Sequence, residues 1–263
     1  MNRQLLDPIP VLGVFVLFAI VCFVFFEIGF RVGRWWQDRM PGEQEGPTDM
    51  LVGSLLALMA FVLAITMGMA ADRFDARRGL VLAEANAIGK AYLQADYLPE
   101  AEAEELQELL REYAPLRIAE VGTTPAELLA KAAASEPLRQ QMWAIVVEAA
   151  RSGYLSDLMS SLGESVSELE SLNESRIVAG VYARVPESIM LLLLVGSALA
   201  LGMVGYNGGL TRHRSLLSAT VLILALGIVT TLVVDLDRPQ DGFLTVSQQA
   251  LKDVQLRIGP PSP

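Results

Sequence analysis

Four long blocks of apolar residues, separated by polar segments, dominate the pattern of hydrophobic and polar positions along the chain. Each block approaches or exceeds the roughly 20 residues that a helix needs to cross about 30 Å of hydrocarbon. The four predicted spans are about 9–30, 50–71, 188–208 and 215–235. The first block is too long for a cleaved signal peptide and lacks a small-residue cleavage site. We therefore expect an all-α, polytopic membrane protein with four transmembrane helices.

A long polar segment, residues 72–187, separates the second and third spans. It carries 20 acidic and 11 basic residues, a net charge of −9, against −10 for the whole chain. Its apolar residues recur at helical spacing, as at Leu106, Leu109 and Leu110, and no part alternates with the period of two that a strand needs. The pattern predicts an acidic helical domain inserted between the second and third spans.

Local signals place the helices of this domain. No proline interrupts the chain from Met50 to Tyr97, so the second span is predicted to continue into the domain as one helix. Thr124, Pro125 and Glu127 have the spacing of an N-cap, a first-turn proline and a capping-box partner. Further helices are predicted for residues 100–120, for 135–151 and from Leu155 towards Pro186.

These patterns divide the chain into four parts. They are a first transmembrane helix pair (1–71), the acidic extramembrane domain (72–187), a second transmembrane helix pair (188–235) and a polar C-terminal tail (236–263).

Four spans place both termini and the inserted domain on the same side of the membrane. Nine basic residues, Arg3 among them, lie near the spans on that side, and five lie in two short loops on the other. The larger number favours a cytoplasmic domain, whereas the density in the short loops favours the reverse. Charge alone leaves the orientation open.

Small residues form one face of the second span. They are Gly53, Ala57, Ala60, Ala64 and Gly68, at spacings of 4, 3, 4 and 4. Such faces let two helix backbones approach closely, which favours association in lipid. The interpretation that we favour from sequence is packing within the four-helix bundle, and the alternative is contact between subunits around a pore.

Three carboxylates are candidates for an ion pathway. Glu27 lies near the end of the first span, where it either extends to the interface or acts within the membrane. Asp235 ends the fourth span and Asp237 follows it. They form either a polar turn that stops the helix or a ring of carboxylates at the mouth of an oligomeric pore.

Other kinds of chemistry find little support. The single histidine, His213, and the single cysteine, Cys22, cannot build a zinc site. The segment after Asp235 begins like a calcium loop, but Pro239 and Gln240 occupy the positions of a ligand and the invariant glycine. No nucleotide-binding motif occurs, and the net charge of −10 argues against nucleic acid. We expect no enzyme, no cofactor and no metal site.

Two stretches resemble a known family. They are RFDARRGLVLAEANAIGKAYLQADYLP with LLREYAPLR, from Arg73 to Arg117, and VVDLDRPQDGFLTVSQQAL, from Val233 to Leu251. Together they are similar to the bacterial bestrophin-like membrane proteins, a family of unknown function. Lys90 departs from the family pattern, which has threonine there.

The resemblance extends distantly to bestrophins, which are pentameric ion channels with cytosolic termini and a cytosolic helical domain. It implies a homo-oligomer in the bacterial inner membrane, in contact with lipid, with the domain and both termini in the cytoplasm and inorganic ions as the permeant species. The leading hypothesis is an ion channel or pore whose acidic vestibule concentrates cations. The alternative is a non-conducting membrane scaffold or sensor whose acidic helices recruit a partner.

Overall fold

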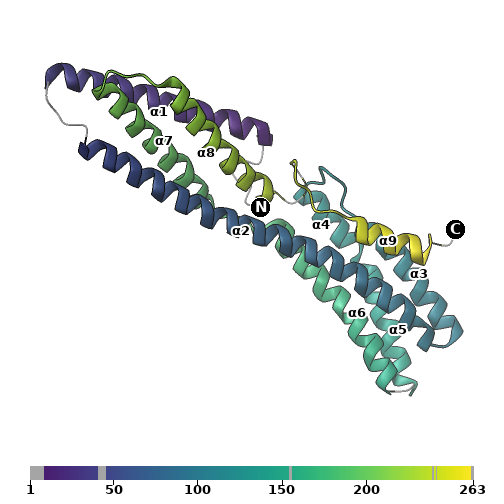
Figure 1. Cartoon of the computed structure of the whole chain (residues 1–263). Helices are drawn as coiled ribbons and strands as arrows, with labels where there is room; N and C mark the ends of the chain where they lie inside the picture. The colour runs from purple at the N-terminus through teal and green to yellow at the C-terminus, as the bar shows by residue number, and fades with distance from the viewer. Residues whose placement is uncertain (1–8, 41–45, 154–155, 239, 241, 262–263) are drawn as a thin grey trace. The chain divides into compact units, whose positions relative to one another are not determined.

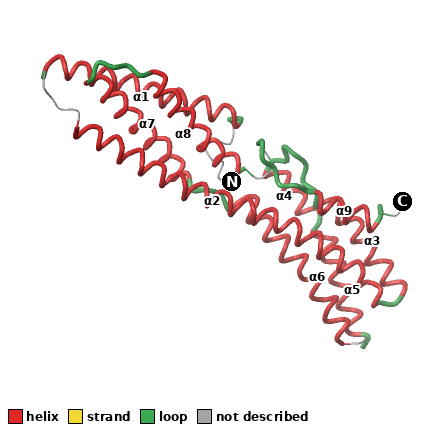
Figure 2. Tube along the Cα trace, viewed as in Figure 1, coloured by secondary structure: helices red, strands yellow, loops and turns green. Residues whose placement is uncertain are grey.

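The computed structural model describes residues 9–40, 46–153, 156–238, 240 and 242–261. No strand occurs in these ranges, so the predicted all-α class is confirmed (Figure 2). Arg3, Leu155 and Pro239, which contributed to the predictions from sequence, lie outside the described residues.

Figure 1 shows the helices of the described residues, coloured in chain order. They are α1 (Val11–Arg39), α2 (Gly46–Gln94), η1 (Ala95–Tyr97), α3 (Glu100–Leu116), α4 (Pro125–Ala134), α5 (Glu136–Arg151), α6 (Ser156–Ile177), the π-helix η2 (Val178–Tyr182), α7 (Glu187–Leu210), α8 (Leu216–Asp237) and α9 (Gln249–Ile258).

The chain divides into two compact units. The membrane unit comprises Met1–Asp72 and Val185–Asp237, and the acidic unit comprises Arg73–Arg184 and Arg238–Pro263. Helix α2 runs without a break from the first unit into the second, as the absence of proline predicted. In the described residues, four helical stretches are long and apolar enough to cross a membrane, and each overlaps one of the four predicted spans.

Glycines let α1 and α7 pack backbone against backbone in the membrane unit. A Cβ atom on Gly29 would clash with the carbonyl oxygen of Gly202, and one on Gly205 would clash with that of Phe26. Helix α8 packs beside them, around a core of Phe18, Cys22, Phe26, Leu201, Ala219 and Ile223. Because lipid is as apolar as these side chains, close van der Waals contact is what holds the helices together.

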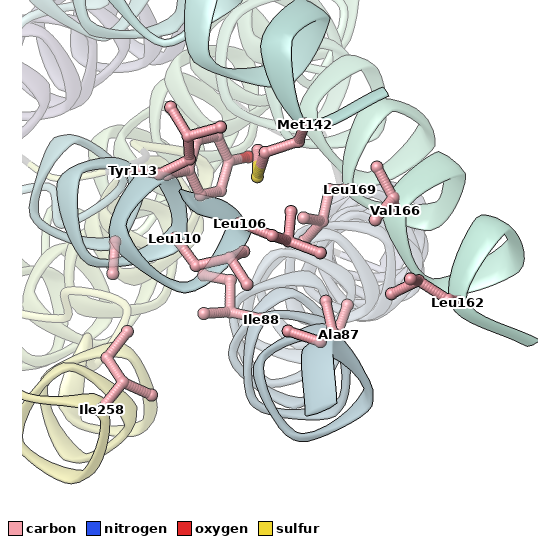
Figure 3. Packing of buried hydrophobic residues seen from close by; sticks show 14 of the residues in the cluster. Ala87, Ile88, Leu106, Leu110, Tyr113, Met142, Leu162, Val166, Leu169 and Ile258 are labelled. Carbon is pink, nitrogen blue, oxygen red and sulfur yellow. The ribbon is translucent and has the colours of Figure 1, made fainter. Parts of the chain in front are cut away.

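The core of the acidic unit draws on all of its longer helices (Figure 3). Leu106, Leu110 and Tyr113 of α3 point towards Ile88 of α2 and Met142 of α5. The other labelled residues are Ala87 of α2, Leu162, Val166 and Leu169 of α6, and Ile258 of α9. Hydrophobic burial of this kind stabilises a soluble fold, so the unit has a core of its own.

Helix α9 has no counterpart among the predicted elements, since residues 236–263 were expected to form a polar tail. Leu251, Val254 and Ile258 are buried at helical spacing, and Arg111 Nε of α3 donates to the Ile258 carbonyl at 2.9 Å. The signal was present in that spacing, but it spans only ten residues. The end of the chain thus belongs to the acidic unit.

Two helix ends differ from the prediction and one start is confirmed. Helix α3 ends at Leu116 rather than residue 120, because Pro115 lies in its last turn and the Arg117 N–H turns back to the carbonyls of Ala114 and Pro115. The helix predicted to run towards Pro186 changes at Val178 into a π-helix. At the start of α4 the capping box is confirmed: Thr124 N–H donates to Glu127 Oε2 at 2.7 Å, and Glu127 N–H donates to Thr124 Oγ1 at 3.3 Å.

Candidate functional site

The small-residue face of α2 is uncovered in the membrane unit. All five of its residues, Gly53, Ala57, Ala60, Ala64 and Gly68, are exposed. A Cβ atom added to Gly53 or Gly68 would meet no heavy atom within 4 Å. The face is therefore not the surface through which α2 packs in its own bundle, which corrects the interpretation favoured from sequence.

A different side of α2 makes the contacts inside the unit. Its buried residues in the span are Met59, Leu63, Thr66 and Ala70, which recur at helical spacing. Met59 fills the space that a side chain at Gly196 of α7 would need. Near the start of α2, Asn207 Nδ2 donates to Asp49 Oδ1 at 2.5 Å. Helix α2 is thus attached to α7 on one side and presents its small residues on another.

Glu27 forms an ion-pair network at the end of the membrane unit. Its two carboxylate oxygens accept from Arg31 Nε at 3.0 Å and from Arg214 Nη2 at 2.5 Å. Arg31 is one turn further along α1, whereas Arg214 comes from the connection between α7 and α8. The negative charge of Glu27 is therefore paired with two positive charges in the single chain. The two ion pairs link α1 to the connection between α7 and α8. A role in an ion pathway stays a prediction.

Asp235 and Asp237 are buried at the end of α8, each 2% exposed. The Val185 N–H, just before α7, donates to Asp237 Oδ1 at 2.7 Å. This bond holds the start of the third span against the end of the fourth. A role at a pore mouth stays a prediction, and the burial of both side chains in the single chain weighs against it.

The acidic unit contains a buried charge cluster that no sequence pattern singled out. Glu84 of α2, fully buried, accepts from Tyr113 Oη at 2.9 Å, from Arg117 Nε at 2.6 Å and from Arg176 Nη1. Arg176 Nη1 also donates to the Arg117 carbonyl at 3.2 Å, so α2, α3 and α6 meet at this carboxylate. The sole signal in the sequence was a carboxylate inside the apolar stretch GLVLAEANAIG.

The cluster keeps Glu84 ionised. Burial raises the pKa of Glu84, but attraction to Arg176 and Arg117 and hydrogen bonds from Arg176 and Tyr113 outweigh it and hold the pKa below the usual 4.5. For Tyr113, burial and the charge of Glu84 raise the pKa, so its hydroxyl remains a neutral donor. The cluster thus places one buried negative charge between two positive ones.

In the part of the chain that the structure describes, no group of three His, Cys, Asp or Glu side chains is placed to hold a metal ion.

Comparison with known proteins places most of the chain in one group. A family model described as a Bestrophin-like domain matches residues 13–251. No curated protein matches the chain in sequence. The fold is similar to the crystal structure of a bacterial bestrophin homologue from Klebsiella pneumoniae, with a TM-score of 0.66 and 14% identity over 93% of this chain and 96% of that one.

Two further solved structures have the same fold. A point variant of the Klebsiella pneumoniae homologue gives a TM-score of 0.70 and 14% identity over 94% of this chain and 96% of that one. A variant described only as a membrane protein gives 0.71 and 12% identity over 92% and 97%.

Proposed function

The chain belongs to the Bestrophin-like family, and from that membership we propose that it is an oligomeric ion channel or pore of the bacterial inner membrane. Four helices able to cross a membrane and a fold shared with a bacterial bestrophin homologue support the proposal. Bestrophins, to which the family is distantly similar, are ion channels. The proposal assigns the chain no catalytic residue and no cofactor.

The observation that carries the proposal is the uncovered small-residue face of α2. A helix that spans a membrane and exposes Gly53, Ala57, Ala60, Ala64 and Gly68 offers a surface where another helix can approach closely. In a closed ring of identical chains, each chain presents the same surfaces to its neighbours. The α2 helices of the ring would then lie against one another around the axis, where an ion could pass.

The acidic unit would form the cytoplasmic entrance of this pore, with both termini on the same side. It holds 20 acidic and 14 basic residues. A vestibule lined by excess negative charge raises the local concentration of cations and lowers that of anions. We therefore propose a channel that prefers cations or selects anions only weakly.

The first test is the mass of the detergent-solubilised particle, followed by single-channel recording of that species in a planar bilayer. We expect a particle of several subunits with discrete conductance steps, and a reversal potential in a salt gradient that is shifted towards cations. A monomer or closed dimer without conductance would contradict the channel proposal and favour the non-conducting scaffold. Conductance with clear chloride selectivity would support the channel proposal but contradict the proposal that an acidic vestibule concentrates cations.

Substitution on the uncovered face provides a second test. Ala60→Leu adds bulk where a neighbouring chain must approach, so we expect the oligomer to dissociate while each chain stays folded. Leu58→Phe adds bulk on another exposed side of α2 and is the matched control. Light scattering of both variants in detergent measures the particle mass. An intact oligomer with Ala60→Leu would show that this face lies outside the subunit contact.

A further inference from the structure

A cavity of about 60 Å³ inside the acidic unit is lined by positive charge. Its walls come from α2, the end of α3 with the connection that follows it, the middle and end of α4, the end of α6 with the π-helix η2, and the segment before α9. Arg77, Arg117, Lys131 and Arg176 all line it, and none of the described residues of its lining is acidic. One ordered water needs only about 10–15 Å³, so the space suits several waters or one small polyatomic ion.

The concentration of positive charge is not a consequence of composition. The acidic unit has more acidic than basic residues, yet four cations surround this cavity. Arg117 is buried, and Arg176 is nearly so. Glu84 pairs with Arg117 and Arg176 together, so one carboxylate faces two guanidinium groups. Among the described residues, Arg117 and Arg176 thus share one counter-charge, and a buried charge without full compensation costs free energy that a bound anion would recover.

Donors remain available around the cavity. Arg117 uses Nε for Glu84, and among the described residues its two Nη groups make no hydrogen bond. Lys131 Nζ donates to the Ile118 carbonyl at 2.7 Å, and within the described chain it forms no ion pair. Arg176 Nη2 lies 3.5 Å from Gln248 Oε1, a long contact. A guanidinium group offers paired donors that match the oxygen atoms of an oxyanion better than a spherical halide.

The π-helix is a second feature of the same place. Ala179, Gly180 and Val181 of η2 line the cavity, and Gly180 has only Leu128 Cδ1 near the position of a Cβ atom, at 3.9 Å. Short π-helical turns occur often at functional sites, because the wider turn displaces side chains and backbone from the regular helix. Here the wider turn forms part of a charged cavity.

We propose that this cavity is a binding site for a small inorganic oxyanion of the phosphate or sulfate class, held by Arg117, Arg176 and Lys131. The oxyanion supplies the negative charge that Glu84 alone does not. The site lies within one chain and does not depend on whether the protein conducts ions.

Isothermal titration calorimetry of the full-length protein in detergent, with inorganic phosphate as the probe, tests the site. We expect saturable binding of one phosphate per chain, competed by sulfate and not by chloride at matched ionic strength. Lys131→Met is expected to weaken binding at least tenfold, because Lys131 contributes a charged donor and forms an ion pair with no carboxylate among the described residues. Lys90→Met removes an exposed lysine of the same unit and is the matched control.

Thermal unfolding of each variant without phosphate establishes that it is folded before titration. If Lys131→Met unfolds, Lys131→Arg keeps the charge and is expected to bind within about threefold of the wild-type affinity. Absence of saturable binding by the wild-type protein, equal competition by chloride, or equal weakening by Lys90→Met would each overturn the proposal.

Discussion

Replacing Glu84 by glutamine is expected to destabilise the acidic unit by about 3–5 kcal/mol, the cost of removing one partner of a buried ion pair. Glutamine keeps the size of the side chain but removes the charge that Arg117 and Arg176 share. Both guanidinium groups would then remain in a buried region without their carboxylate. Thermal unfolding of the detergent-solubilised protein, followed by tryptophan fluorescence, measures the loss.

Glu104→Gln is the matched control, since Glu104 is an exposed carboxylate on α3 in the same unit. Exposed ion pairs contribute roughly 0–1 kcal/mol, so this variant should unfold within about 1 kcal/mol of the wild type. Equal effects of the two substitutions would mean that the Glu84 cluster is solvated in solution. A large effect confined to Glu84→Gln would establish it as the link between α2, α3 and α6.

The same substitution predicts a change in pH dependence. The folded state holds the pKa of Glu84 below 4.5, so the folded protein releases this proton more readily than the unfolded chain does. The resulting stabilisation is complete above about pH 4.5 and is lost as the pH falls through the folded pKa. The stability difference between wild type and Glu84→Gln should therefore shrink in acid. A constant difference from neutral pH down to about pH 3 would contradict the assignment.

Replacing Gly205 by alanine is expected to cost about 3 kcal/mol, the upper end of the usual cost of overpacking. The added methyl group would clash with the carbonyl of Phe26, which is backbone and cannot turn away as a side chain could. Helices α1 and α7 would have to separate along their shared face, losing van der Waals contact that lipid does not replace. The thermal midpoint and the fraction eluting as a single species in detergent measure the effect.

Gly202→Ala, less than one turn away on α7, provides the comparison. Its nearest neighbour would be the Phe25 carbonyl at 3.5 Å, an ordinary van der Waals distance. We expect this variant to stay within about 1 kcal/mol of the wild type, because a methyl group at that distance adds contact without strain. If both alanine variants lower the stability equally, the loss arises from alanine substitution anywhere in this part of α7 and not from the contact with α1.

Sequence alone determined the elements whose signals are local. A span is recognised from about 20 consecutive apolar residues, and the start of α4 from Thr124, Pro125 and Glu127 within one turn. The resemblance also rested on continuous stretches of sequence. Helix α9 was missed although its buried residues are regularly spaced, because ten residues in a polar segment give a weak periodic signal.

Only the tertiary structure decided which side of each helix is covered and which distant charges meet. The small residues of α2 would suit either a neighbouring helix of the same chain or one of another copy, and their spacing is the same in both cases. Glu84 meets Arg117 and Arg176 across 33 and 92 positions of sequence. Hydropathy and helical period describe each segment separately, so they carry no information about contacts between segments, and those contacts arise only when the helices pack.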